Sequence, residues 1–439
     1  MMLETTTTVR RRQVPLVSLL STNFRGGGVQ MSMLRKARRL MAMGFEVEML
    51  VFEREGPLLE CHGKGIAIVE LVAGSAALGR WLAFRADPGG IGDYLRPVFL
   101  ADPPPHRLGF LASLAGYLRE RRPEALISAG SGPNMLAIWA RRLANVPTRV
   151  VVSERDIVSP SIENDRRWRR LYLPSALRRT YAMADAVVAV SKGVADDLAA
   201  VTGLPREFIS VIYNPVVDSK LAQLAAAPLD HPWFRTGEPP VLLAVGRLAR
   251  QKDYPTLIEA FARVRAERVA RLLILGSATN EEDTARERTT IMQLAAQKGV
   301  AGDLELGGFA ANPAAYMARA ALFVLSSRHE GLGNVLIEAL ACGCPVISTD
   351  CPYGPAEILD HGRYGRLVPV GDSEAMAIAI LATLDEPPDR ERLSARGAEF
   401  TVERAVDAYL ELLFPGSRCS PHLSPDLPNA TSRVFPRRL

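Results

Sequence analysis

Short apolar runs alternate with longer amphipathic stretches along most of this chain, and the alternation restricts the folds that it can adopt. Residues 16–20 form one strand-like run, 29–43 follow a helical period, and 46–52 form the next strand-like run. The same order returns at 125–128, 135–143 and 149–153. Because strands that alternate with helices pair as parallel neighbours, the pattern predicts an α/β protein built from doubly wound sheets.

The alternation is interrupted once, which predicts two domains. Strands at 186–190 and 209–212 complete a first set, and a proline-rich stretch follows from 225 to 240. The strands predicted for a second set are 241–245, 271–275, 304–306, 321–324 and 345–348. The resulting division is an N-terminal domain at 1–217, a linker at 218–240, a C-terminal domain at 241–400, a helix at 401–415 that packs back toward the N-terminal domain, and a disordered tail at 416–439.

Charge is distributed unevenly between the two halves. The first 215 residues carry 29 Lys and Arg against 20 Asp and Glu, a net charge of +9, whereas the remainder carries −4. The basic half is expected to meet an anionic partner, although charge alone does not separate phospholipid, a lipid phosphate and nucleic acid. The five cysteines are odd in number and too few for a disulfide framework, which favours a reducing compartment and predicts a cytoplasmic protein.

The most informative segment, residues 327–345, reads SRHEGLGNVLIEALACGCP and connects a predicted strand to a helix. A loop in this position lies at the sheet edge where α/β domains bind ligands. The main-chain N–H groups expected to approach a pyrophosphate there, together with the positive end of the helix, are those of Gly331, Leu332, Gly333 and Asn334. Glu338, about two turns into the helix, is placed to accept hydrogen bonds from ribose hydroxyls.

Two cations follow the first strand of the second domain. Arg247 and Lys252 lie in a loop before a helix in which Asp253 is the candidate cap and Pro255 falls in the first turn. At that edge they would stabilise the negative charge of a departing nucleoside diphosphate. Each charged residue taken alone is equally well explained as a solvated side chain, but their joint position at strand ends favours a ligand site.

A run of glycines, Gly26, Gly27 and Gly28, follows the first strand and precedes a helix. Backbone without side chains can approach a ligand closely, here from the opposite side of an interdomain cleft. The run lacks the full G-x-G-x-x-G pattern of dinucleotide-binding proteins, which disfavours an NAD-dependent oxidoreductase.

With these motifs in place, the chain resembles the retaining glycosyltransferases of family 4 over roughly residues 14–414. That resemblance implies the GT-B fold, in which two Rossmann-like domains face each other across a cleft. It implies that Glu330 contacts hydroxyls of the donor sugar near the reacting carbon and that Glu338 binds the ribose. It assigns Arg247 and Lys252 to the diphosphate, and the glycine run to the donor phosphates and the acceptor.

One position departs from the family pattern. Many members carry a histidine after the strand that ends near Ser153, whereas this chain reads Ser-Glu-Arg and has Arg155 there. Arg155 is therefore a candidate contact of the acceptor or of a phosphate, as in similar members with polyprenyl-diphosphate-sugar acceptors. The phrase CPYGPAEIL, residues 351–359, also resembles bacterial members that build cell-surface polysaccharides or glycans.

No cofactor or metal is expected. The chain has no Asp-x-Asp motif, which supplies the metal ligand in the other major glycosyltransferase fold. Positive side chains and a helix N-terminus can stabilise the diphosphate instead. His329 beside Glu330 is interpreted as a cleft-wall or structural residue.

Basic and aromatic residues suggest contact with a membrane surface. Residues 166–179 mix arginines with Trp168, and a second basic cluster on the helix at 29–43 consists of Arg35, Lys36, Arg38 and Arg39. Such surfaces suit anionic lipid head groups, although a solvated basic face explains them nearly as well. No run of about 18 apolar residues spans a bilayer, so we predict a peripheral protein on the cytoplasmic face of the inner membrane.

Together these features predict transfer of a hexose or N-acetylhexosamine from a UDP- or GDP-sugar to a lipid-linked saccharide or similar acceptor. A nucleic-acid partner is not expected. Two alternatives share the fold: a nucleotide-sugar epimerase or hydrolase, and a non-catalytic binding protein. The presence of Glu330, Glu338, Arg247 and Lys252 disfavours the second.

Overall fold

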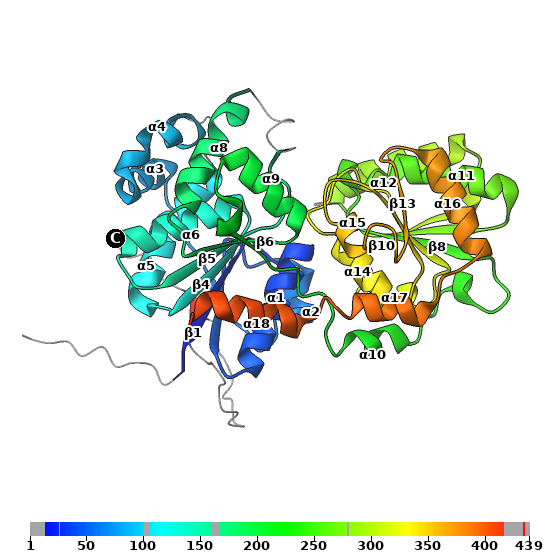
Figure 1. Cartoon of the computed structure of the whole chain (residues 1–439), viewed down its shortest axis with the longest axis horizontal. Helices are drawn as coiled ribbons and strands as arrows, with labels where there is room; N and C mark the ends of the chain where they lie inside the picture. Colours follow the sequence, from blue (N-terminus) through cyan, green and yellow to red (C-terminus); the bar gives the residue numbers. More distant parts are fainter. Residues whose placement is uncertain are drawn as a thin grey trace, which may run out of the picture.

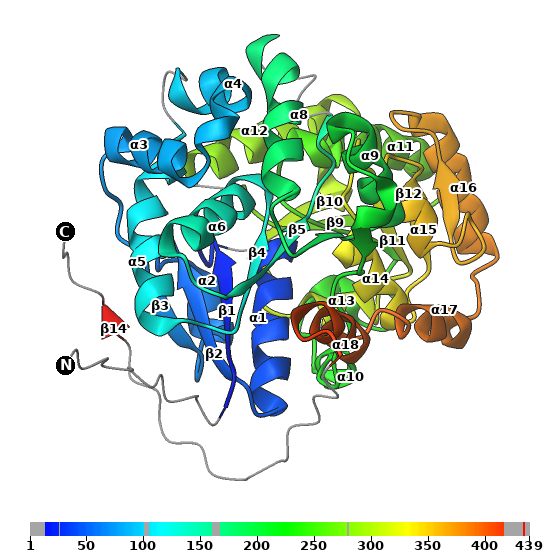
Figure 2. The same ribbon diagram turned by 60° about the vertical axis from the view of Figure 1, so that its left-hand side comes forward.

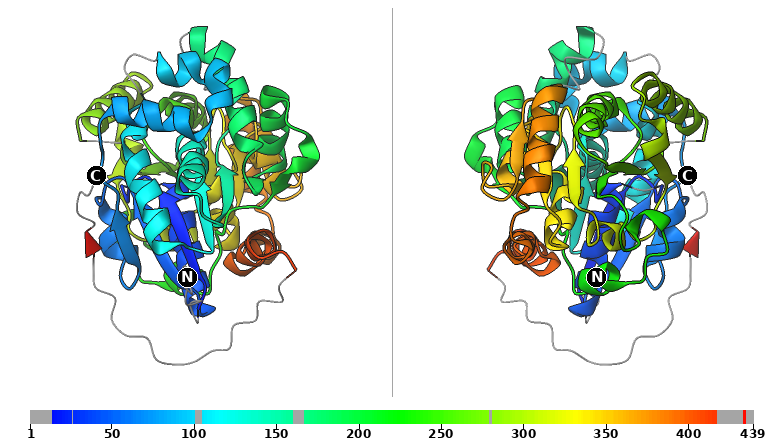
Figure 3. Two further views of the ribbon diagram at one scale, coloured as in Figure 1. Left: turned by 90° about the vertical axis from the view of Figure 1, so that its left-hand side faces the viewer. Right: turned by 90° about the vertical axis from the view of Figure 1, so that its right-hand side faces the viewer.

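The computed structural model describes residues 14–25, 27–100, 105–159, 167–278, 281–416 and 433–434. Within these residues, every pair of neighbouring strands is parallel. These residues form two sheets, ordered β14-β3-β2-β1-β4-β5-β6-β7 and β10-β9-β8-β11-β12-β13. Helices cover both faces of each sheet (Figures 1 and 3). The predicted α/β fold with two doubly wound, Rossmann-like domains is confirmed.

The N-terminal sheet and its helices comprise β1 (Leu16–Ser21), α1 (Gly28–Ala42), β2 (Glu46–Val51), α2 (Pro57–His62), β3 (Ala67–Glu70), α3 (Ala76–Ala86), α4 (Ile91–Tyr94), α5 (Leu111–Arg121), β4 (Ala125–Ala129), α6 (Ser131–Ala144), β5 (Arg149–Glu154), α8 (Arg167–Tyr181), β6 (Ala186–Ala189), α9 (Lys192–Thr202) and β7 (Ile209–Val211). The two-residue strand β14 (Arg433–Val434) pairs with β3. The rest of the predicted tail beyond residue 416 lies outside the described residues.

The second sheet and its helices comprise α10 (Leu221–Ala226), β8 (Val241–Val245), α11 (Tyr254–Glu267), β9 (Arg271–Leu275), α12 (Glu281–Gln297), β10 (Leu304–Gly308), α13 (Pro313–Met317), β11 (Leu322–Leu325), α14 (Asn334–Ala341), β12 (Val346–Thr349), α15 (Pro355–Ile358), β13 (Arg366–Val368), α16 (Ser373–Asp385) and α17 (Arg390–Gly397). The final helix α18 (Val402–Leu413) returns to the first domain (Figure 2).

Helix α18 buries its apolar face against the N-terminal domain. Val406, Tyr409 and Leu413 share a core cluster with residues of α1 and of the β1–β2 sheet. The ring of Phe414 stacks on Phe45, with centroids 5.7 Å apart. Helix α18 therefore packs on the domain to which the first strand belongs.

Lys36 is buried in this interface. Its Nζ donates to Ser32 Oγ at 3.2 Å and lies 4.5 Å from the centre of the Tyr409 ring. Burial lowers the pKa of Lys36 well below 10.5, and the charge of Arg155 lowers it further. The unfolded chain therefore binds a proton that the folded protein gives up, so the free energy of unfolding should rise with pH up to about 10.5.

Lys36→Met should remove this pH dependence and raise the free energy of unfolding at pH 7 by about 1 kcal/mol, because an apolar side chain suits the site better. Urea unfolding at pH 7 and at pH 9 measures both effects. The exposed Lys64→Met serves as the matched control and should leave the slope unchanged. An equal pH slope in Lys36→Met and in the unchanged protein would contradict this assignment.

The two domains are joined by two neighbouring crossings. Val217 pairs with Thr401 in an isolated parallel bridge. The N–H groups of Val216 and Val217 both donate to Phe400 O, at 3.2 and 3.0 Å, and Val402 N–H donates to Val217 O at 2.9 Å. The intervening helix α10 packs on α13, and the ring of His231 contacts that of Tyr316, so the linker lies on the C-terminal domain.

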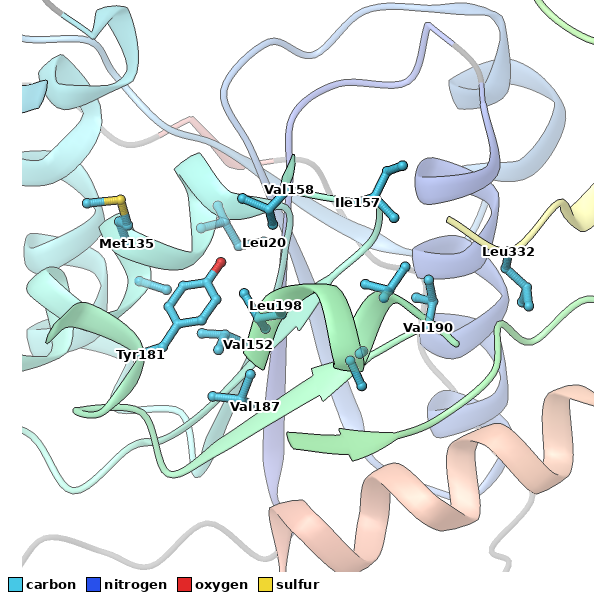
Figure 4. Packing of buried hydrophobic residues seen from close by; sticks show 14 of the residues in the cluster. Leu20, Met135, Val152, Ile157, Val158, Tyr181, Val187, Val190, Leu198 and Leu332 are labelled. Atoms are coloured by element: carbon cyan, nitrogen blue, oxygen red, sulfur yellow. The ribbon is translucent and has the colours of Figure 1, made fainter. Parts of the chain in front are cut away.

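The apolar core continues from one domain into the other. Leu332, from the loop before α14, belongs to the same cluster of buried side chains as Val190 and Ile157 of the N-terminal domain. Figure 4 shows these residues in the packed region beside α9. The domains therefore touch through side chains, and the loop predicted to bind the donor forms part of that contact.

Among the described residues, no helix combines the length and the apolar character that crossing a bilayer requires.

Candidate active site

Lys252 and Glu330 meet at the carboxyl edge of the C-terminal sheet. Lys252 Nζ lies 2.5 Å from Glu330 Oε1, and Ser327 Oγ donates to the same oxygen at 2.7 Å. Both charged side chains are largely buried, 13% and 10% exposed. The sequence placed these residues 78 positions apart in separate motifs, and the fold brings them together because β8 and β11 are neighbours.

Backbone contacts fix the position of Lys252. Ser326 Oγ donates to Lys252 O at 2.6 Å. Gly246 leaves room for the lysine side chain, since a Cβ at Gly246 would lie 2.9 Å from Lys252 Cε. The ammonium group of Lys252 therefore reaches Glu330 past Gly246, where a larger residue would require the lysine side chain to shift.

Asp253 does not cap α11 as predicted. It occupies the N-cap position with φ 47°, but its carboxylate accepts no hydrogen bond from the backbone N–H groups of the helix. Instead Asp253 accepts from Thr256 Oγ1 at 3.0 Å and pairs with Arg328 at 3.1 Å. The left-handed backbone turns the carboxylate toward side-chain partners, which explains why the cap prediction was wrong.

Arg247 lies in the same loop and is exposed. It makes no hydrogen bond or ion pair within the part of the chain that the structure describes. The guanidinium is thus available to a ligand at the sheet edge, next to the Lys252–Glu330 pair.

Two helix N-termini lie against each other across the domain boundary. Helix α14 begins after Gly333, φ 95°, and α1 begins after Gly27, φ 119°, and neither N-cap residue contributes a side-chain hydrogen bond. Asn334 Nδ2 lies 3.4 Å from Gly28 O, and Asn334 Oδ1 accepts from Asn214 Nδ2 at 2.7 Å. Uncapped first-turn N–H groups suit an anion. Gly26 lies outside the described residues.

Glu338 is engaged by the other domain. Its Oε1 lies 3.0 Å from Arg35 Nη2, and the side chains of the two residues are 17% and 14% exposed. The same arginine lies 3.4 Å from Pro215 O. Arg35 therefore contributes to the interdomain contact, while Lys36 of the same predicted basic cluster is buried under α18. This cluster on α1 is not the exposed basic face that the sequence predicted.

The loop Gly331 to Gly333 is held by the N-terminal domain. Ser191 Oγ donates to Gly331 O at 2.7 Å. A Cβ at Gly331 would lie 2.2 Å from Arg155 O, so only glycine permits this approach. The side chain of Leu332 is 2% exposed and packs in the shared apolar core, which makes it an interdomain contact as well as a part of the predicted loop.

The CPYGPAEIL segment forms a second interdomain contact. Glu357 accepts from the N–H groups of Lys192 and Gly193 at 3.0 and 2.8 Å, and from Tyr213 Oη at 3.1 Å. A carboxylate at the start of α9 satisfies N–H groups that the helix itself leaves unpaired and favours its positive end.

The side chain of Arg155 is buried, 9% exposed, on the side of the N-terminal domain that α18 covers. Its Nε and Nη2 have no hydrogen-bond partner among the described residues. Burial lowers the pKa of Arg155, and the nearby Tyr409 and Glu154 oppose this effect. The predicted contact between Arg155 and an acceptor or phosphate is not resolved by this geometry and stays a prediction.

A hollow of about 310 Å³ lies in the N-terminal domain, and sequence reasoning missed most of it. Its lining is formed by Thr22, Val29, Gln30, Arg107 and residues 129–133. The signal was present in the glycines of Gly130-Ser131-Gly132, which follow β4 and begin α6. Behind them Glu154 accepts from Tyr181 Oη at 2.6 Å, and burial raises the pKa of Glu154 to about 7.

A second hollow, of about 290 Å³, lies between α11 and α12, with Arg250, Arg286 and Ile291 among its lining residues. It includes neither Lys252 nor Glu330. The charged pair and the uncapped start of α14 lie instead at the interdomain edge.

His329 contributes a pH-dependent contact between the domains. Its Nδ1 lies 3.9 Å from Asp156 Oδ1. The Asp156 carboxylate raises the pKa of His329 above 6.5, against an opposing effect of burial. A raised pKa in the folded state means that the contact stabilises the fold below pH 6.5 and is lost as pH rises through the folded pKa.

His329→Asn should therefore lower Tm at pH 6 and leave it nearly unchanged at pH 8.5. Differential scanning calorimetry at several pH values measures the difference. Asp156→Asn should give the same pattern, and the double substitution should add nothing further, because the two residues act as one pair. A decrease in Tm that is the same at every pH would contradict a role for the protonated His329 side chain.

Two facing Rossmann-like domains, with a cation and carboxylate pair at a helix N-terminus, define the GT-B class of proteins. Residues 26–220 match the model of Glycosyltransferase Family 4, and residues 239–386 match the model of Glycosyl transferases group 1. The two models together cover most of the chain, which belongs to this family of glycosyltransferases.

Individual relatives agree with this assignment. The chain is 35% identical over 234 residues to the lipopolysaccharide core biosynthesis glycosyltransferase LpsE of Rhizobium meliloti, a match over 52% of this chain and 64% of that protein. It is 29% identical over 279 residues to an N-acetylgalactosaminyltransferase of Campylobacter jejuni whose name specifies a diphospho-undecaprenol acceptor, covering 63% of this chain and 70% of that protein. HepE of Anabaena, solved with UDP and glucose, has the same fold, with a TM-score of 0.69, 20% identity, and coverage of 91% and 99% of the two chains.

Proposed function

We propose that this chain moves a hexose or N-acetylhexosamine from a UDP- or GDP-sugar to a lipid-linked saccharide or a related acceptor, with retention at the anomeric carbon, in surface polysaccharide or glycan synthesis. The observation that carries the proposal is the Lys252–Glu330 pair beside the uncapped start of α14. This edge combines positive charge for a diphosphate with a carboxylate for sugar hydroxyls.

In the proposed reaction the bond between the anomeric carbon and the diphosphate oxygen breaks, and negative charge develops on the diphosphate. Lys252, Arg247 and the N–H groups at the start of α14 stabilise that charge. An acceptor hydroxyl then attacks from the same face and its proton passes to the departing diphosphate. The proposed chemistry needs no metal, since these groups supply the positive charge.

The acceptor is assigned to the hollow in the N-terminal domain. Arg107 provides a cation there, and the glycines at 130 and 132 expose backbone to the hollow. A phosphate or diphosphate of a lipid-linked saccharide has the charge that this lining favours. The Campylobacter jejuni relative, named for a diphospho-undecaprenol substrate, supports this acceptor class.

Such an acceptor implies a position on the cytoplasmic face of the inner membrane, where the protein would be held peripherally and would need no nucleic-acid partner. The basic N-terminal half, with a net charge of +9, agrees with a negatively charged surface.

The test begins with the donor. Thermal shift with UDP, GDP, ADP and NAD should show selective stabilisation by one nucleoside diphosphate, because a ligand of the folded state raises Tm. Incubation with the matching sugar nucleotide, with and without a lipid-linked acceptor, follows. A product that forms only with the acceptor supports transfer. A free sugar or an epimerised donor would show a hydrolase or an epimerase, and binding without turnover would show a non-catalytic protein.

A further inference from the structure

Exposed large apolar side chains are concentrated on one part of the N-terminal domain. Of the fourteen in the described residues, six fall within 78–100. These six, which we call the α3–α4 patch, are Leu78, Trp81, Phe84, Ile91, Leu95 and Leu100. A concentration of exposed large apolar side chains is typical of an interaction site, whereas single exposed apolar residues are not.

The patch arises because α3 turns its small residues inward. Gly79, Ala83 and Ala86 are buried, whereas Trp81 is 52% exposed. A Cβ at Gly79 would lie 2.4 Å from Leu108 O, so α3 lies directly on the backbone of the 3-10 turn His106–Phe110. The close approach needs a glycine, and the large side chains are left on the outer face.

Arginines accompany this apolar surface. The guanidinium of Arg85 lies 5.0 Å from the centre of the Trp81 ring. Asp87 is buried and pairs with Arg179 of α8, with Arg179 Nε 2.6 Å from its Oδ2. Helix α8 packs against α4 and carries five arginines and no acidic residue. Figures 1 and 2 show α3, α4 and α8 at the same end of the domain.

The patch and the proposed acceptor hollow share one segment. The turn His106–Phe110 supports α3 through Leu108 and contributes Arg107 to the lining of the hollow. The α3–α4 patch and the hollow therefore lie on either side of one short turn, so a partner bound at the patch is close to the hollow.

We propose that the α3–α4 patch docks on the interface of an anionic phospholipid bilayer, with Trp81 and Phe84 among the head groups and the flanking arginines against lipid phosphates. The mixture of Trp, Phe and Leu with Arg is the composition of interfacial membrane-binding surfaces. An anionic surface also matches the cations of α8. This inference rests on the proposed function, because it gives a lipid-linked acceptor a route to the hollow.

The test is flotation of the full chain with phosphatidylcholine vesicles that contain either no anionic lipid or one third phosphatidylglycerol. Binding should require phosphatidylglycerol. Trp81→Ser combined with Phe84→Ser should lower the partition coefficient by about tenfold or more, since two apolar side chains no longer enter the interface. The matched control is Ile378→Ser, a 62% exposed apolar residue on α16 of the other domain, which should bind as before.

Three outcomes would reject the docking surface. Absence of vesicle binding, or equal binding by the double variant, excludes it. Concentration-dependent self-association that the double variant abolishes would assign the patch to a second copy of this chain. Transfer to an acceptor dissolved in detergent tests the enzyme separately, because that assay contains no bilayer. Failure of transfer with intact vesicle binding would therefore overturn the proposed function and not the site of docking.

Discussion

Lys252→Ala should lower kcat by about a hundredfold, within a range of ten- to a thousandfold, because in the proposed reaction it removes a cation that stabilises the departing diphosphate. The effect should fall mainly on kcat, since the negative charge on the leaving group grows in the transition state. Initial rates at saturating donor and acceptor measure it. Unchanged turnover in the folded variant would refute the role of Lys252.

The variant also leaves the Glu330 carboxylate without its charged partner in a largely buried position, so the folding of the variant needs a separate check. Circular dichroism and Tm provide that check. Lys298→Ala is the control, because Lys298 is an exposed lysine of the same domain that pairs with Glu259 at 3.0 Å, away from the proposed site. It should retain full activity.

Gly331→Ala should lower kcat by about a hundredfold because it changes how the two domains pack against each other. The added Cβ would lie 2.2 Å from Arg155 O and 3.1 Å from Asp156 Cα, both backbone atoms of the other domain. The domains must separate locally to relieve the overlap. Misplacing the reacting groups by about 1 Å is enough to lower kcat by about a hundredfold. Small-angle X-ray scattering should show a larger radius of gyration.

Gly302→Ala separates this effect from the general cost of replacing a glycine. Gly302 belongs to the same domain, and a Cβ there would meet open space. It should leave both kcat and the radius of gyration unchanged. Full activity in Gly331→Ala would mean that the contact with Arg155 O is absent in the working enzyme.

Much of the fold could be predicted because strand and helix periods are strong local signals. The predicted strands at 241–245 and 271–275 coincide with β8 and β9. Strands β3 and β13 were missed because each is only partly buried and includes a charged residue, whereas the equally short β6 and β11 are buried throughout and form continuous apolar runs. The exposed face of α3 was missed because its pattern is inverted, with small residues inside.

The charged residues of the site could be predicted from the sequence, but the ion pairs that they form could not. Lys252, Glu330 and Glu338 were identified from spacing and resemblance, but the ion pair of Glu338 with Arg35 depends on how the domains meet. Local sequence contains no information on that orientation. The roles of these three residues toward substrates, like those of Arg247 and Arg155, stay predictions.

The two crossings that run side by side at Val217 and Thr401 make the C-terminal domain an insertion into the N-terminal one. The chain enters and leaves the C-terminal domain at neighbouring positions, so residues 217–401 could be exchanged as one segment, which we call the cassette. If the donor and the acceptor bind to separate domains as proposed, exchanging this cassette with that of another family member would combine the donor preference of one enzyme with the acceptor preference of the other. In such a hybrid, the interdomain contacts made by Asn334, Glu338 and Glu357 would need suitable partners on the new N-terminal domain for the two domains to pack together.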